Sequence, residues 1–470
     1  MKPKLKVFQN FSAQLLPHEA KYLSGLSEFQ DDQKREIFSR VIANTLSRQP
    51  KEFDPEIDKR KYHYIKSWIE TRLDQRDVDK VGSWVLDFQK HLSLDLLDSK
   101  EETQMLDYLK QYKRIGYNFQ LLYSMAQEYR YYLLVRLRYD DHLIVEDFLS
   151  RYKSAYLKAQ KIHQKLYEAT GEITHKYSSA SKEISHWEKW LLKVFKTSEI
   201  DGNNRYKAFV LLAFLYTTTK NARKLQEIFE LIDGYFTLGD LYSRRILYNY
   251  YSNSVLLYSQ LKDYTKAIYF GELALGQSNS DTLMHVNHLV AIYLRVKAHS
   301  EALSLLENYK SLYESSQNVH QKITYISNYL RVLDELKQWK KAENIGLYFL
   351  SRYEKELFDY RWHHFFTSYL NLLLQSEHYS MILSLEKKYQ LRKKEAESRV
   401  PNGYIPTISW SVDLAEYMEE QLDASVLISR ITESLKGIEL SESQKEVLAR
   451  TSSTLVAALP ELKDIFKSHL

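Results

Sequence analysis

The sequence predicts an all-α protein, built from amphipathic helices and including a series of helical repeats. No proline occurs between Pro55 and Pro401, although average usage of about 5% would place about 17 there. Only 12 of the 470 residues are glycine, and glycine and proline are the residues that most disfavour helices. Apolar residues recur at spacings of three and four, the period of a helix with one buried face.

Composition excludes several kinds of chemistry. The chain has no cysteine, which rules out disulfides, thiolate nucleophiles and cysteine-ligated metal clusters. The 66 basic and 61 acidic residues leave a net charge of +5, with no long block of one sign to indicate a nucleic-acid partner. The N-terminus lacks the apolar run of a signal peptide, and the longest apolar stretch, residues 208–216, is too short to span a membrane. We therefore expect a cytoplasmic protein without membrane association.

Residues 1–200 are expected to form an N-terminal helical domain. Pro17 and the pair Asp54-Pro55 each place a proline at a first helical position, and Ser99 with Glu102 matches a capping box. These signals predict helix starts near residues 18, 55 and 100. Residues 56–171 then form four or five amphipathic helices.

The segment Tyr129–Asp141 is the one stretch where a strand competes with a helix, because its apolar residues partly alternate. No second β-rich segment lies nearby, and a lone strand has no partner. We therefore predict a helix here.

Residues 201–399 carry a repeat. In each of five segments the expected second helix of a helix pair holds apolar or small residues at spacings of 3, 4 and 3, as in Ala222, Leu225, Phe229 and Ile232. The second position of this template falls at residues 225, 267, 302, 342 and 382, at intervals of 42, 35, 40 and 40. Each interval suits one antiparallel helix pair, which can bury its apolar face only against a neighbouring pair.

One of these units resembles a tetratricopeptide repeat, on the residues Tyr251, Val255, Tyr258, Tyr264, Ala267, Ala274 and Leu275. Ala302 and Ala342 match the small residues of that family in later units, whereas Gly271 and Gly346 replace its usual aromatic residue. The resemblance covers about residues 206–395, lacks the family's repeat-terminal proline and mostly exceeds its 34-residue period. It implies a helical solenoid, and another family of helical solenoid stays open.

Residues 400–470 are expected to be a C-terminal helical cap. Pro401, Gly403 and Pro406 cluster in a loop, and Ser441 with Gln444 matches a second capping box, which predicts a helix start near 442. Solenoids need such a terminal element with one polar face.

Polar residues recur on the expected first helices of the repeats, which line the concave face of a helix-pair solenoid. The resemblance implies that asparagines here bind the backbone of a partner peptide and that basic residues bind its carboxylates. Asn253 and Asn328 fall at matching positions of the template. The full set of candidates is Asn249, Asn253, Asn287, His288, Asn328, Arg331, His364 and Asn371. The alternative, that helix surfaces simply carry some asparagines, remains open.

Neither a metal site nor an active site is indicated. His285 and His288 are three residues apart on one expected helix, but no carboxylate accompanies them at ligand spacing. Acidic pairs such as Asp140-Asp141 lie at expected helix starts, where they complement the helix dipole. We expect no cofactor, no metal ion and no enzymatic activity.

The sequence therefore predicts a non-enzymatic scaffold or adaptor that binds a protein or peptide. The alternative is a regulatory protein that associates with nucleic acid through two basic or aromatic segments. These segments are Tyr129–Arg138 and the basic residues Lys387, Lys388, Arg392, Lys393, Lys394 and Arg399. Three acidic residues lie among the six basic residues of the second segment, and this mixture favours a solvated helix face.

Overall fold

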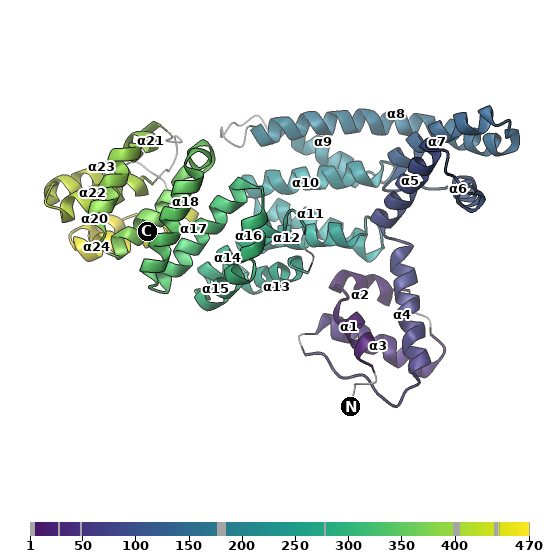
Figure 1. The fold of residues 1–470 in the computed structure, drawn as a ribbon, viewed down its shortest axis with the longest axis horizontal. Coiled ribbons are helices and arrows are strands. Elements are labelled where there is room, and N and C mark those ends of the chain that lie inside the picture. The colour runs from purple at the N-terminus through teal and green to yellow at the C-terminus, as the bar shows by residue number, and fades with distance from the viewer. Residues whose placement is uncertain are drawn as a thin grey trace. The chain divides into compact units, whose positions relative to one another are not determined.

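The computed structural model of the chain is all-α (Figure 1), as the sequence predicts. It describes residues 5–26, 29–47, 49–175, 185–276, 279–397, 405–436, 440 and 442–469. Within these ranges the chain forms 25 helices and no β-strand. None of the helices in these ranges is both long enough and apolar enough to cross a membrane.

The chain divides into two compact units, residues 1–266 and 267–470. The division falls inside α13 (Tyr264–Ala274), within the region of helix pairs. We predicted boundaries after residues 200 and 399 from changes in the sequence pattern. The division into two compact units does not test these boundaries, so they stay predictions.

The first unit begins with two groups of helices, α1 to α4 and α5 to α8. The second group has a hydrophobic core that includes Phe88, Tyr129 and Phe148. The helices of the first group pack on one another and are α1 (Lys6–Ala13), α2 (Pro17–Ser24), α3 (Asp32–Leu46) and α4 (Lys59–Asp74). Those of the second group are α5 (Val78–Ser93), α6 (Ser99–Gln111), α7 (Phe119–Val135) and α8 (Tyr139–His175), which α9 (Ser185–Lys196) follows.

A buried carboxylate ties α2 to the helix pairs of the first unit. Glu19 is fully buried, and its carboxylate accepts hydrogen bonds from the Leu16 N–H at 2.9 Å and the Tyr242 hydroxyl at 2.7 Å. Arg244 completes the site as a bidentate partner, with Nε and Nη2 at 2.8 and 3.0 Å from the two oxygens. A buried charge is stable only when paired and hydrogen-bonded, so this cluster fixes how α2 packs.

Two helix starts differ slightly from the sequence prediction. Pro17 does open α2, but Asp54 and Pro55 form a turn, and α4 begins at Lys59 behind the N-cap Asp58. The capping box of α6 uses Asp98 with Glu101, one residue before the predicted pair. The predicted N-cap Ser441 lies outside the described residues.

The segment Tyr129–Asp141 is helical as predicted, but it contains a chain reversal that the prediction missed. Helix α7 ends at Val135 and α8 begins at Tyr139, with Leu137 between them at a φ of 56°. The alternating apolar residues that resembled a strand therefore lie where α7 ends and α8 begins.

Five helix pairs follow at the predicted positions. They are α10 (Gly202–Thr218) with α11 (Ala222–Thr237), α12 (Arg244–Gln260) with α13, α14 (Thr282–Arg295) with α15 (His299–Asn308), α17 (Val319–Glu335) with α18 (Trp339–Tyr360), and α19 (Trp362–Gln375) with α20 (Tyr379–Tyr389). The short α16 (Lys310–Ser315) follows α15, and the longer α18 has a break in its helical geometry at Tyr353.

One turn geometry joins the two helices of every pair. The residue that reverses the chain has a φ between 51° and 59° and is Lys220, Lys262, Lys297, Lys337 or Glu377. The next residue donates its N–H to a carbonyl five positions back, as from Gln338 to Leu333 at 2.8 Å, and the reversing residue bonds three positions back. This is a Schellman motif, which usually places glycine where these turns have lysine or glutamate.

Two glycines allow helices of the second unit to approach closely. A Cβ on Gly346 of α18 would lie 2.3 Å from a ring carbon of Tyr369 on α19, and one on Gly271 would lie 2.7 Å from Leu289 on α14. Real Cβ contacts are not this short, so glycine is required at both places.

Four helices follow the C-terminal linker helix α21 (Leu391–Glu397): α22 (Thr407–Met418), α23 (Ala424–Leu435), α24 (Glu442–Ala458) and α25 (Leu462–Lys467). The buried Glu395 accepts hydrogen bonds from the N–H groups of Ile408 and Ser409, which caps the first turn of α22. These helices share one hydrophobic core with α14 to α20.

We predict that Leu137→Gly raises the free energy of unfolding of the first unit by about 0.5–1 kcal/mol, because glycine adopts a positive φ without the steric clash of a side chain. Leu143→Gly is the matched control, because Leu143 is a similarly exposed leucine inside α8. It should lower stability by about 1 kcal/mol. Thermal unfolding of the full chain by circular dichroism measures both, and a lower melting temperature for Leu137→Gly would contradict the turn geometry.

Gly346→Ala is expected to lower the stability of the second unit by about 1–3 kcal/mol, because the fully buried Tyr369 ring has no space to move into. Gly234→Ala in α11 is the control, since a Cβ there meets nothing within 4 Å and alanine favours the helix. The same thermal scans test both variants. Equal melting temperatures for Gly346→Ala and wild type would refute the close approach.

Candidate partner-binding site

Three first helices of the second unit bring most of the predicted site residues together. Helix α17 packs on α14 (both labelled in Figure 1) and on α19. Six of the eight candidates lie on them: Asn287 and His288 on α14, Asn328 and Arg331 on α17, and His364 and Asn371 on α19. We call these six residues the polar row.

The asparagines of the polar row link neighbouring helices. Asn287 donates its side-chain amide to the backbone carbonyl and the side chain of Gln321, both at 3.0 Å. Asn328 donates to the carbonyl of Asn287 at 3.4 Å, and Asn371 donates to Asp334 at 2.8 Å. Asn287 and Asn328 are only 2% exposed. Their amide groups therefore hold α14, α17 and α19 in register.

Asn249 and Asn253 lie on α12 in the first unit. Asn253 donates its amide to the carbonyl of Asn249 at 2.8 Å, which is a bond within its own helix. Burial raises the pKa of the Tyr206 hydroxyl to about 12, and the hydrogen bond with the Asn249 side chain opposes that shift. Both asparagines are half-buried.

Positive charge gathers around His364. Arg331 of α17, Arg361 before α19 and Arg450 of α24 all lie close enough to lower the pKa of this histidine electrostatically. Burial is the larger cause, and together these effects lower the His364 pKa to about 3. We call Arg331, Arg361 and Arg450 the arginine cluster. Sequence reasoning found only the first of them.

A second histidine shares this environment. Burial, followed by the nearby His285 and Arg361, lowers the pKa of His288 to about 4. Its Nδ1 is buried and has no hydrogen-bond partner among the described residues. Both imidazoles are therefore neutral at pH 7, and His288 keeps a polar atom without an internal partner.

Asp334 is the carboxylate that faces this cluster. Burial raises its pKa, while the hydrogen bond from Asn371 and the nearby Arg450 oppose that shift. Arg450 is itself so enclosed that burial lowers its pKa despite Asp334 and the neighbouring Glu335. The Nε of Arg450 is buried without a hydrogen-bond partner in the described part of the chain. Three guanidinium groups thus lie near His364, and the carboxylates of Asp334 and Glu335 lie near one of them, Arg450.

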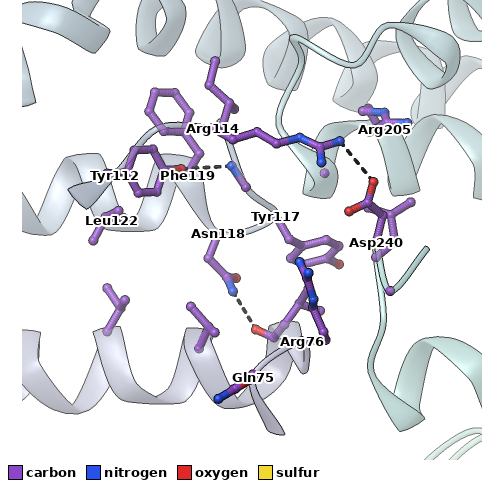
Figure 2. Close-up of a pocket in the computed structure, with 18 of the residues that line it drawn as sticks. Gln75, Arg76, Tyr112, Arg114, Tyr117, Asn118, Phe119, Leu122, Arg205 and Asp240 are labelled. Atoms are coloured by element: carbon purple, nitrogen blue, oxygen red, sulfur yellow. Dashed lines mark hydrogen bonds and ion pairs between the residues drawn. The ribbon is translucent and has the colours of Figure 1, made fainter. Parts of the chain in front are cut away.

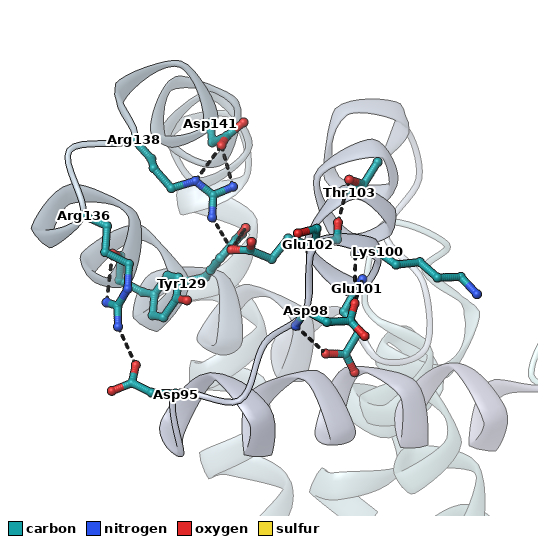
Figure 3. A network of polar contacts seen from close by, with 12 residues as sticks. Asp95, Asp98, Lys100, Glu101, Glu102, Thr103, Tyr129, Arg136, Arg138 and Asp141 are labelled. Atoms are coloured by element: carbon teal, nitrogen blue, oxygen red, sulfur yellow. Dashed lines mark hydrogen bonds and ion pairs between the residues drawn. The ribbon is translucent and has the colours of Figure 1, made fainter.

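The segment Tyr129–Arg138, one half of the predicted alternative site, has its arginines paired with carboxylates. Figure 3 shows the Arg138 guanidinium between Glu102 and Asp141, with Nη2 at 2.6 Å from the latter. Arg136 pairs with Asp95 at 2.6 Å, and Arg130 pairs with Glu146 at 3.2 Å. These charges stabilise the contacts of α6, α7 and α8 and are already neutralised.

The basic segment of residues 387–399 is similarly engaged. Arg392 binds Asp413 at 2.8 Å and also Glu416, which attaches α21 to α22. Lys388 lies 3.1 Å from Glu354, and Arg399 is outside the described residues. This segment therefore contributes to the attachment of the C-terminal helices.

A cavity of about 260 Å³ lies in the first unit, between residues 75–122 and 202–241 (Figure 2). Arg76, Arg114 and Arg205 line it with one carboxylate, Asp240, which pairs with Arg114 at 3.1 Å. No histidine lines the cavity, so it lacks the usual acid and base pair of a hydrolytic site. The predicted absence of enzymatic activity stays a prediction.

The described residues contain no group of three or more histidine and acidic side chains that could hold a metal ion. His285, the first member of the pair considered in the sequence, directs its Nδ1 to the carbonyl of Ala274 at 3.2 Å. This contact joins α14 to α13.

No protein-family model, no curated protein and no solved structure matches the chain.

We predict that stability of the second unit decreases as pH falls below about 6.5, where histidine in the unfolded chain takes up a proton but His364 in the folded chain does not. The loss grows by up to about 1.4 kcal/mol per pH unit until the folded-state pKa is reached. His364→Gln should flatten this dependence, measured as the urea midpoint between pH 7.5 and 5. His378→Gln, at an exposed position, is the control for loss of an imidazole. If the urea midpoint of His364→Gln changes with pH as much as that of wild type, the lowered pKa of His364 in the folded chain is contradicted.

Proposed function

We propose that this chain is a non-enzymatic scaffold that binds an acidic segment of a partner protein. The helix pairs are proposed to form a tetratricopeptide-like solenoid, with the polar row on its concave face. The observation that carries the proposal is the arginine cluster, in which three guanidinium groups lie near the neutral His364 and one of them, Arg361, also lies near the neutral His288.

The recurring turns support the solenoid. The reversing residues Lys220, Lys262, Lys297, Lys337 and Glu377 follow one another at the same intervals as the apolar template, 42, 35, 40 and 40 residues. Ala267, Ala302 and Ala342 occupy the small-residue position of the template and are fully buried. Identical hairpins that repeat at a nearly constant interval are the physical basis of a solenoid.

The proposed mechanism assigns different roles to the asparagines and the charged residues. Asn287 and Asn328 hold the first helices in register, as their bonds to neighbouring helices support. Arg331 and Arg361 bind carboxylates of the partner, beside the neutral imidazole of His288. Arginine suits this role because its planar guanidinium binds a carboxylate through two parallel hydrogen bonds.

Selection from a library of random displayed peptides, with the full chain as bait, tests the proposal. The selected peptides should be rich in Asp and Glu, because a carboxylate supplies the charge that the arginine cluster lacks. Fluorescence anisotropy should show that the double variant Arg331→Gln, Arg361→Gln weakens a selected peptide by about tenfold or more.

Lys310→Gln with Lys337→Gln is the control, because it removes the same charge from exposed positions of the second unit. The single variant Arg361→Gln covers the case in which Arg331 is needed for folding, since Arg361 is exposed and its bond to Thr324 is long, at 3.3 Å. Selected peptides without acidic enrichment, or equal affinity for wild type and Arg361→Gln, would refute the proposal.

A further inference from the structure

A second surface of unusual charge lies in the first unit, between α8 and α9. It is an open groove of about 890 Å³. Its residues come from positions 150–165 of α8, from α9 and from the segment that follows α9. Five lysines line it: Lys153, Lys158, Lys161, Lys165 and Lys193. We call it the lysine groove.

No acidic side chain lines the lysine groove. Residues 148–167 contain four of the five lysines and Arg151 but no Asp or Glu. Arg151 pairs with Asp147, whereas the described residues provide no ion pair for any of the five lysines. Hydrogen bonds are the larger causes that lower the pKa of Glu199, and Lys158 is near enough to lower it further. Within the described residues, the groove therefore concentrates positive charge with no ion pair to neutralise it.

The floor of the lysine groove is apolar. It is formed by Leu157, Ile162, Trp190, Val194 and Ile200. Leu157 is 48% exposed, which is unusual for a leucine beside several charges. Lys165 lies over the Trp190 ring, with its Nζ 4.8 Å from the ring centroid. An apolar floor with a cationic rim is complementary to a ligand that has an apolar face and acidic edges.

We propose that the lysine groove binds an acidic amphipathic helix of a partner protein. From Ser150 to Lys165 the groove follows α8 over about 22 Å, the length of about 15 helical residues. Lys158, Lys161 and Lys165 are spaced by three and four residues, so they form one stripe along this helix. Leucines of the bound helix would cover Leu157 and Trp190, and its carboxylates would pair with the stripe.

The chemistry of the groove favours such a helix over a nucleic acid or a membrane. Its cations are all lysines, without the arginines that bind phosphates through two hydrogen bonds, and aliphatic floor residues do not contact phosphate. A hollowed apolar surface is covered by a helix, whereas membrane association uses protruding apolar side chains. This proposal concerns the first unit and is independent of the function proposed for the arginine cluster.

Fluorescence anisotropy with the full chain tests the proposal. The probe is a labelled helical peptide of Leu, Ala and Glu, with leucines on one face and glutamates along both edges. We expect binding that weakens as salt is raised, because lysine–glutamate pairs at the rim are screened. The double variant Lys158→Glu, Lys161→Glu should weaken binding about tenfold or more, and Leu157→Ala should weaken it several-fold.

Lys100→Glu with Lys113→Glu is the matched control, because it makes the same charge change at exposed positions outside the groove. A peptide of the same composition in scrambled order tests whether the apolar face is needed. No binding at low salt, equal binding of the scrambled peptide, or an unchanged affinity in Leu157→Ala would overturn the proposal. It would also be overturned if a single-stranded oligonucleotide or phosphatidylserine vesicles bound and the peptide did not.

The Arg331→Gln, Arg361→Gln variant separates the two proposals. It should keep the probe binding that Lys158→Glu, Lys161→Glu removes, because the altered residues lie in the second unit. Loss of probe binding in this variant but not in Lys158→Glu, Lys161→Glu would place the site on the arginine cluster and overturn the inference.

Discussion

The Schellman turn between paired helices is the constraint on which the helix pairs depend. Each turn satisfies two carbonyls at the end of the first helix and sends the chain back along it. A non-glycine residue at positive φ costs about 1 kcal/mol, which these two hydrogen bonds and the packing of the pair offset. Within each unit, first helices of successive pairs meet: α10 contacts α12, α14 contacts α17, and α17 contacts α19.

The second helices could be predicted from sequence, because their buried residues follow the helical period and fall on one face. The turns could not, since lysine or glutamate at positive φ carries no signal of its own: Lys297 and Lys337 look like any exposed lysine. The reversal at Leu137 was missed for the same reason. An acidic residue followed by a proline also proved ambiguous, because Asp54 bonds the N–H of Glu56 in a turn rather than capping α4.

The candidate site was predictable only where its residues recur on the first helices. Arg361 lies at the junction between α18 and α19, and Arg450 belongs to a helix that no repeat pattern connects to the rest. Their proximity to His364 depends on tertiary packing. Ion pairs also depend on tertiary packing. The segment of residues 387–399 has the most noticeable bases, and Arg392 within it is paired with Asp413 and Glu416 of α22. The stripe of Lys158, Lys161 and Lys165 is less conspicuous but keeps its charge.

A small net charge therefore conceals two concentrated positive surfaces. Many acidic residues cap helices or form ion pairs that join helices. Asp98 caps α6, and Glu102 pairs with Arg138. What decides the field at a surface is whether a base has a carboxylate within a few ångströms, because more distant exposed charges are screened over about 8–10 Å. The arginine cluster gathers its charge around enclosed histidines, and the lysine groove gathers its charge around apolar residues, with no acidic side chain in its lining. The first can orient single carboxylates through guanidinium groups, whereas the second attracts a distributed acidic surface, so the two surfaces suit differently shaped acidic ligands.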